Sequence, residues 1–97
     1  MNRVVFTPRA RADLDDIWEY TARRWGIDQA EQYLRRIAEA TELIAETPGR
    51  GRNCNHVREG YRKYPVGSHV LFYREMSGSV DVVRILHQQM DFDRHLP

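Results

Sequence analysis

Cysteine is nearly missing from this sequence, with Cys54 the only one in 97 residues. A lone cysteine cannot close an internal disulfide, so the disulfide-stapled folds of small secreted proteins are excluded. Long apolar runs are missing as well: a membrane-spanning helix needs roughly 18 apolar residues, and the apolar start at residues 4–6 is too short for a signal peptide. We therefore expect a protein with no membrane segment that stays in a reducing cytoplasm.

Lysine is equally scarce, because Lys63 stands alone and arginine supplies every other basic side chain. The net charge of +1 is unevenly spread. Residues 1–49 hold seven Arg against nine acids, or −2, whereas residues 50–97 hold eight basic side chains against five acids, or +3. The excess is densest over residues 50–63, with five basic side chains and one acid. This segment is either a docking surface for something acidic or a solvated, arginine-rich loop.

What the sequence does contain is ordinary for a globular protein, with 41% apolar and 30% charged residues. No internal repeat or low-complexity stretch divides it. A chain of this length and composition predicts a single domain over residues 1–97 with one modest core.

The first predicted helix follows a short strand at residues 4–6. Thr7 is suited to cap this helix, Pro8 fits its first position, and Gly26 can end it with a left-handed backbone. Apolar residues at helical spacing mark its buried face: Leu14, Ile17, Trp18, Thr21 and Trp25. The opposite, solvated face is expected to carry Asp13, Asp16, Glu19 and Arg23.

The second predicted helix has a capping box at its start, Asp28 with Glu31, and Pro48 with Gly49 at its end. Its apolar stripe consists of Ala30, Leu34, Ile37, Ala38, Thr41, Ile44 and Ala45. A connection of about three residues makes the two helices an antiparallel hairpin. Because neither helix can bury its stripe on the other alone, a sheet must follow.

Three strand-like runs follow, at residues 57–64, 69–76 and 80–87, with turn compositions between them. Connections this short make the strands antiparallel neighbours. The third run is the most apolar and is expected to be a central strand. The chain thus predicts an α+β fold of order β-α-α-β-β-β, with an antiparallel helical hairpin on one face of a small antiparallel sheet and a short tail or helix over residues 88–97.

No motif in the sequence predicts a metal site, a cofactor or a catalytic nucleophile. Cys54 and His56 lie two residues apart, but nothing near them completes a zinc ligand set. A nucleophilic Cys54 would need both a base and a lowered pKa, and its arginine neighbours supply only the second.

Arg84 is conspicuous because it interrupts the most apolar strand. It either pairs with an acid such as Asp81 or Glu75, or belongs to a cationic patch that binds phosphates or carboxylates. The members of that patch are Arg62, Lys63, Arg84 and His87.

In five segments the chain resembles ParE, the toxin family of ParDE toxin–antitoxin pairs within the RelE/ParE superfamily. These segments are residues 12–20, 24–30, 60–63, 67–74 and 83–91. The most specific motifs are G-S-H-x-x-F-Y-R, in the fourth segment, and I-L-H-Q-x-M-D, in the fifth. The match covers nearly the whole chain in order, and the family fold has the β-α-α-β-β-β order already predicted.

This resemblance implies a toxin that poisons DNA gyrase and blocks replication. It also implies neutralisation by a ParD-type antitoxin, whose ordering C-terminal segment lays apolar residues into a groove beside the hairpin, forming a hetero-oligomer. We expect the antitoxin contacts to include Arg62, Tyr64 and Arg84. The residues expected to contact the target are His87, Met90 and Arg94. No sequence-specific nucleic-acid binding is expected.

RelE-type relatives instead cleave mRNA on the ribosome, which requires cations at the scissile phosphate and groups that move protons. In this chain those roles would fall to the cationic patch. The tyrosine that closes many such sites is not matched, since Gln88 follows His87, and the lysine-rich helix is missing. We therefore expect a non-enzymatic poison, with the endoribonuclease and a non-toxic, antitoxin-binding co-repressor as alternatives.

Overall fold

The computed structural model describes residues 2–90 and 92–96; Asp91, which ends one family motif, lies outside them. The elements are β1 (Arg3–Phe6), α1 (Pro8–Trp25), α2 (Ile27–Glu46), the 3-10 turn η1 (Pro48–Arg50), β2 (Arg52–Asn53), β3 (Tyr61–Val66), β4 (His69–Met76), β5 (Ser79–His87) and α3 (Phe92–His95). The predicted α+β order is confirmed. The structure adds a two-residue strand, β2, and begins β3 at Tyr61 instead of residue 57.

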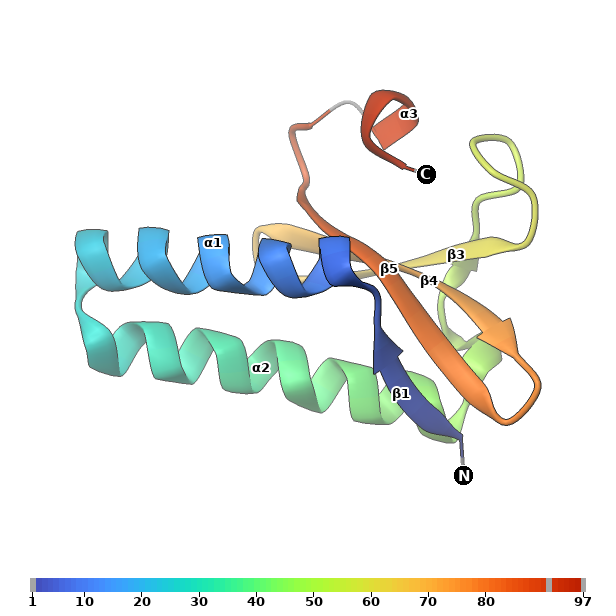
Figure 1. The fold of residues 1–97 in the computed structure, drawn as a ribbon, viewed down its shortest axis with the longest axis horizontal. Helices are drawn as coiled ribbons and strands as arrows, with labels where there is room; N and C mark the ends of the chain where they lie inside the picture. The colour runs from blue at the N-terminus through green and yellow to red at the C-terminus, as the bar shows by residue number, and fades with distance from the viewer. Residues whose placement is uncertain (1, 91, 97) are drawn as a thin grey trace.

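The sheet has five strands in the order β1-β5-β4-β3-β2, so β5 is an interior strand as expected. Strands β3, β4 and β5 are antiparallel neighbours, but β1 pairs with β5 in parallel, from Arg3 opposite Ser79 to Phe6 opposite Val82. The expectation of a wholly antiparallel sheet is wrong on this point. Strands joined by a long crossover can run parallel, and here the crossover includes the whole helical hairpin (Figure 1).

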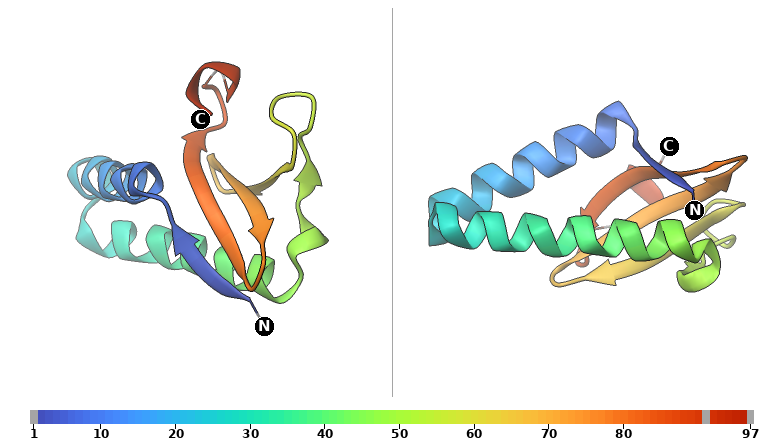
Figure 2. Two further views of the ribbon diagram at one scale, coloured as in Figure 1. Left: turned by 45° about the vertical axis from the view of Figure 1, so that its right-hand side comes forward. Right: turned by 90° about the horizontal axis from the view of Figure 1, so that it is seen from below.

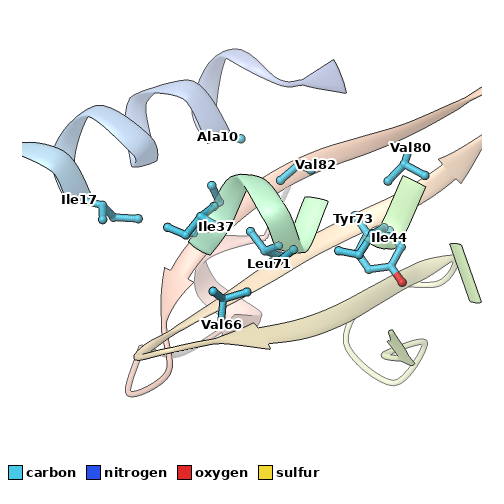
Figure 3. Close-up of a cluster of buried hydrophobic side chains, with 11 residues drawn as sticks. Ala10, Ile17, Ile37, Ile44, Val66, Leu71, Tyr73, Val80 and Val82 are labelled. Atoms are coloured by element: carbon cyan, nitrogen blue, oxygen red, sulfur yellow. The ribbon is translucent and has the colours of Figure 1, made fainter. Parts of the chain in front are cut away.

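The hairpin lies on one face of the sheet and extends beyond it, with the turn between α1 and α2 far from the N-terminus (Figures 1 and 2). Its main core joins both helices to β4 and β5 (Figure 3). The fully buried side chains at the centre of this core include Ile44, Leu71, Tyr73, Val80 and Val82.

The opposite face of the sheet is also covered, because a second, smaller core forms there. Neighbouring residues of a strand point to opposite faces, so Val70 and Phe72 face away from the hairpin. They pack with the loop residue Cys54 and with Leu96, which follows α3. The expectation that helices cover only one face needs this correction: the loop before β3 and the C-terminal segment cover the other.

The ends of the helices follow the sequence signals in part. Thr7 caps α1, since its Oγ1 accepts a hydrogen bond of 3.1 Å from the Ala10 N–H. Gly26 ends α1 at a φ of 98°, and α2 begins at the very next residue. The capping box predicted at Asp28 is therefore wrong: a one-residue joint places Asp28 inside the first turn, where its charge still suits the helix dipole.

The apolar face of α1 is only partly buried. Ile17 and Thr21 are buried, but Trp18 is 36% exposed and Trp25 is 60% exposed. The expectation that both tryptophans belong to the core is wrong, because the hairpin extends past the sheet and leaves the end of α1 without a surface to pack on (Figure 1).

Candidate functional site

A groove of about 690 Å³ lies between the end of the hairpin and the sheet, where β4 begins and β5 ends. Helix α1 contributes Ile17, Tyr20 and Trp25 to its wall. Tyr20 is 61% exposed, and its ring packs edge-on against Trp25 with centroids 6.1 Å apart. The remaining lining residues include Tyr33 and Arg36 of α2, His69 of β4, Arg84 to His87 of β5, and Met90. The result is an open, largely apolar cleft with polar groups at its sheet end.

Arg84 lies at the rim of this groove and is bound by Asp13 of α1. Its Nε and Nη2 donate to the two carboxylate oxygens at 2.8 and 2.9 Å, and its Nη1 donates to the carbonyl of His95 at 2.8 Å. The two side chains of the pair are only 8% and 11% exposed. Arg84 thus pairs with an acid, as one of the two alternatives held, but the acid is Asp13 and not Asp81 or Glu75. The placement of Asp13 on a solvated face is wrong.

The reason for this pairing is the end of β1. Strand β1 covers β5 only as far as Val82, and a bulge leaves Val83 without a partner on β4. Beyond that point the Asp13 carboxylate takes the place of a neighbouring strand, because its Oδ2 also accepts the Ile85 N–H at 2.9 Å. The hydrogen bond from Arg84 to Asp13 raises the pKa of the guanidinium, which stays charged.

Two histidines form the sheet end of the groove. His69 and His87 face each other across β4 and β5, with ring centroids 5.4 Å apart in an edge-to-face arrangement. The hydroxyl of Tyr33 lies 2.6 Å from His69 Nδ1. Burial and the neighbouring His87 lower the pKa of His69, although the Asp13 carboxylate opposes the shift. His69 is therefore neutral at pH 7.

A second, smaller hollow of about 420 Å³ lies beside η1 and β3. It is basic, with Arg50, Arg52 and Lys63 in its lining, and Lys63 Nζ lies 6.0 Å from the centre of the Phe92 ring. The predicted basic segment thus collects three of its cations in one place. Tyr64 also lines this hollow.

Comparison with known proteins shows the family of this chain. Residues 4–92 match the model of the family described as "ParE toxin of type II toxin-antitoxin system, parDE". The chain belongs to the ParE toxin family. It is thus a ParE-type toxin of a toxin–antitoxin system, as the resemblance in its sequence indicated.

The relatives of this ParE-family toxin agree. It is 52% identical over 96 residues to Toxin ParE1 of Mycobacterium tuberculosis, covering 98% of both chains. It is 49% identical over 88 residues to Toxin ParE1 of Caulobacter vibrioides, covering 91% of both. A solved structure titled "Chromosomal ParDE TA system from P. aeruginosa" has the same fold, with a TM-score of 0.78 at 20% identity over 90% of this chain and 96% of that one.

The structure of this ParE-family toxin separates the predicted site residues. Arg84, His87 and Met90 line the groove, whereas Lys63 and Tyr64 line the basic hollow. The two remaining residues, Arg62 and Arg94, are not part of either lining. The four residues of the proposed nuclease set are thus not gathered in one hollow, and the contacts assigned to antitoxin and target stay predictions.

Sequence reasoning missed Asp13, Tyr33 and Arg36 as site residues. Asp13 falls on the polar side of the helical pattern, and its partner is 71 positions away. Tyr33 and Arg36 are three residues apart on one helix face, and the Arg36 guanidinium lies 5.7 Å from the centre of the Tyr33 ring. This three-residue spacing of an aromatic and a basic side chain is the one signal in the sequence that could have indicated Tyr33 and Arg36 as site residues.

Metal ligands, membrane helices and the cysteine can each be described for the part of the chain that the structure covers. Residues 2–90 and 92–96 hold no group of three His, Cys, Asp or Glu side chains placed to bind a metal. Within the same residues no helix has the length and apolarity needed to cross a bilayer. Burial raises the pKa of the Cys54 thiol, only partly opposed by Lys63, so the thiol is protonated at neutral pH.

Proposed function

We propose that this ParE-family toxin binds the C-terminal segment of a ParD-type antitoxin in the groove, and that the free toxin poisons DNA gyrase in the cytoplasm and blocks replication. The observation that carries the proposal is the open groove with exposed aromatic walls at the end of the hairpin. The gyrase target rests on the resemblance to the family.

The groove suits an ordering peptide. Its aromatic side chains Tyr20 and Trp25 are exposed in the free toxin, and the apolar Ile27, two residues after Trp25, is 62% exposed. Large apolar side chains gathered on the surface mark a place where a partner is buried. An amphipathic segment that folds on binding can cover them with its apolar face.

A role without catalysis is favoured by the state of Arg84. A nuclease needs free cations at the scissile phosphate. Here the Arg84 Nε, Nη1 and Nη2 all donate to groups of the protein itself. The Arg84 guanidinium therefore stabilises the fold. A RelE-type nuclease would have one cation fewer to bind the scissile phosphate.

The antitoxin interaction is tested with Trp25→Ala. Loss of a buried aromatic anchor is expected to weaken binding of the ParD-type antitoxin by about 2 kcal/mol or more. Trp18→Ala is the matched control, because Trp18 belongs to the same helix but not to the groove lining. Equal affinities for Trp25→Ala and the unaltered toxin would remove the groove as the binding site.

Two further residues, Arg62 and Tyr64, are proposed antitoxin contacts for a segment that continues onto β3. Charge reversal in Arg62→Glu is expected to weaken antitoxin binding by about 1.5–3 kcal/mol through a lost charge-assisted contact. An unchanged dissociation constant would refute this placement.

The target is tested by adding purified toxin to a gyrase supercoiling reaction. We expect supercoiling to stop, and the antitoxin to restore it. Arg94→Glu tests the proposed target contact at His87, Met90 and Arg94, and is expected to abolish inhibition without affecting antitoxin binding. Cut mRNA with untouched supercoiling would favour the endoribonuclease, and harmless overexpression would favour the co-repressor.

A further inference from the structure

The contacts of His69 favour one position for its proton. The hydroxyl oxygen of Tyr33 already accepts the Ser68 N–H at 3.0 Å. The hydroxyl proton has two acceptors in reach, His69 Nδ1 at 2.6 Å and the Val66 carbonyl at 3.3 Å. The nitrogen is the closer one, so the distances favour the arrangement in which Tyr33 donates to Nδ1 and neutral His69 carries its own proton on Nε2.

The proton of His87 is fixed in the same way. The backbone N–H of Gln89 donates to His87 Nδ1 at 3.2 Å, so neutral His87 also carries its proton on Nε2. Both imidazoles therefore have Nδ1 occupied by a donor of the protein. What remains available on each ring is an Nε2–H donor, and both residues line the groove.

The charges that face this pair come from three elements. Helix α1 supplies Asp13 and Asp16, β5 supplies Arg84, and α2 supplies Arg36. The Asp13 charge is already matched by Arg84. Neither Arg36 nor Asp16 has an ion-pair partner among the described residues. The α2 side of the groove thus offers several hydrogen-bond donors and one cation, Arg36, and these suit an anionic acceptor.

We propose that Tyr33, Arg36, His69 and His87 form a carboxylate subsite in the groove, which receives an acidic side chain of the antitoxin segment and takes up a proton when it does so. The inference rests on the proposed binding of the antitoxin in this groove. A carboxylate can accept both Nε2–H groups, and its charge favours the imidazolium form of the histidine beside it.

His69 is suited to take up this proton. When its Nδ1 becomes protonated, the Tyr33 hydroxyl can turn its own proton to the Val66 carbonyl and accept the new N–H, so no hydrogen bond is lost. His87 has no such second arrangement, because a proton on its Nδ1 would displace the Gln89 N–H. The pair is therefore unequal, with His87 acting mainly as a donor.

The experiment measures the affinity of the full-length toxin for the ParD-type antitoxin by calorimetry at pH 7.5 and pH 6.0. Binding that takes up a proton tightens as the pH falls, here by about three- to tenfold over this range. The variant His69→Gln keeps a side-chain donor but cannot become charged, so its affinity is expected to change far less with pH. His56→Gln is the matched control, since His56 is exposed in the loop before β3 and should keep the full dependence.

The outcomes separate this inference from the proposed function. Absence of binding at either pH would remove the function itself, whereas tight binding that is independent of pH, or weaker at pH 6.0, would overturn only the carboxylate subsite. Nitrogen NMR of the free toxin gives a second readout that needs no variant. It should show both histidines with the proton on Nε2 at pH 7.5, and a proton on Nδ1 of neutral His69 would contradict the proposed arrangement.

Discussion

Asp13 shows how much one side chain contributes to this molecule. Its two oxygens accept three hydrogen bonds, two from the Arg84 guanidinium and one from the Ile85 backbone. They join the start of α1 to the end of β5 at the point where β1 stops. A buried arginine that loses its partner has no replacement for that charge.

Asp13→Asn is expected to destabilise the toxin by about 3 kcal/mol, because the amide leaves the buried guanidinium without an opposite charge. Urea unfolding followed by circular dichroism measures the change. Asp15→Asn is the control, since Asp15 is an exposed carboxylate on the same helix, and it should change the stability by less than about 0.5 kcal/mol. Equal midpoints for the two variants would contradict the role of the pair.

His69 is expected to make the stability depend on pH. Its pKa in the folded toxin is below the ordinary value of 6.5, so the unfolded chain binds more protons in this region. The stability is therefore full above pH 6.5 and falls as the pH is lowered through the folded pKa. Urea midpoints at pH 7.5 and 5.5 measure this fall. His69→Gln should show a smaller one, and an equal fall in both proteins would assign the dependence to other groups.

At the scale of the elements, the beginning of α1 is fixed by Thr7. Its hydroxyl accepts the Ala10 N–H and donates to the Val83 carbonyl at 2.9 Å, so one side chain both caps the helix and ties it to β5. Thr47 stands at a comparable place before η1, but among the described residues its side chain makes no capping hydrogen bond.

Thr7→Ala is therefore expected to lower the free energy of unfolding by about 1–2 kcal/mol through the lost cap and tie. Thr47→Ala is the matched control and should lie within about 0.5 kcal/mol of the unaltered toxin. Thermal unfolding measures both. A loss of stability in Thr47→Ala as large as that in Thr7→Ala would mean that the cap is not the cause.

The turn from η1 into β2 requires a glycine. A Cβ on Gly51 would lie 2.8 Å from the Lys63 carbonyl oxygen and would overlap the Tyr73 hydroxyl, which the Gly51 N–H itself bonds at 2.8 Å. Gly51→Ala is expected to destabilise by about 1–3 kcal/mol, since a packed backbone must shift. Gly49→Ala, whose Cβ would meet nothing within 4 Å among the described residues, should be close to neutral in the same unfolding experiment.

The elements were the part of the fold that the sequence could predict. Thr7 and Gly26 are local signals, and local signals placed the ends of α1 correctly. The orientation of β1 and the partner of Arg84 were beyond such reasoning, because each depends on residues more than 70 positions apart. Three residues of the groove lining, Arg84, His87 and Met90, had been singled out in the sequence. Arg84 was expected to contact the antitoxin and the other two the target, and these roles stay predictions. Tyr33 and Arg36 were not singled out, since a helix face gives no sign of which sheet residues it meets.

At the scale of the whole molecule, the groove lies between the helical hairpin and the sheet, where α1 and α2 face the start of β4 and the end of β5. The two tryptophans report on it unequally: Trp25 lines the groove and Trp18 does not. Burial of an exposed indole shifts its fluorescence to shorter wavelength.

Antitoxin binding is therefore expected to shift the tryptophan emission to the blue, and Trp25→Phe should remove most of this shift. Trp18→Phe is the control and should retain it. Steady-state emission spectra, taken with an antitoxin that contains no tryptophan or with its spectrum subtracted, are sufficient. An undiminished shift in Trp25→Phe would place the antitoxin elsewhere on the toxin.

The parallel pairing of β1 with β5 sets the order of events during synthesis. Strand β1 pairs with β5, and the Thr7 hydroxyl donates to the Val83 carbonyl, which is 76 positions later in the sequence. The sheet therefore cannot be completed before the ribosome has synthesised β5. Contacts so distant in sequence also form slowly. A newly synthesised molecule thus passes through a period in which the β1–β5 pairing is missing and the toxin fold is incomplete.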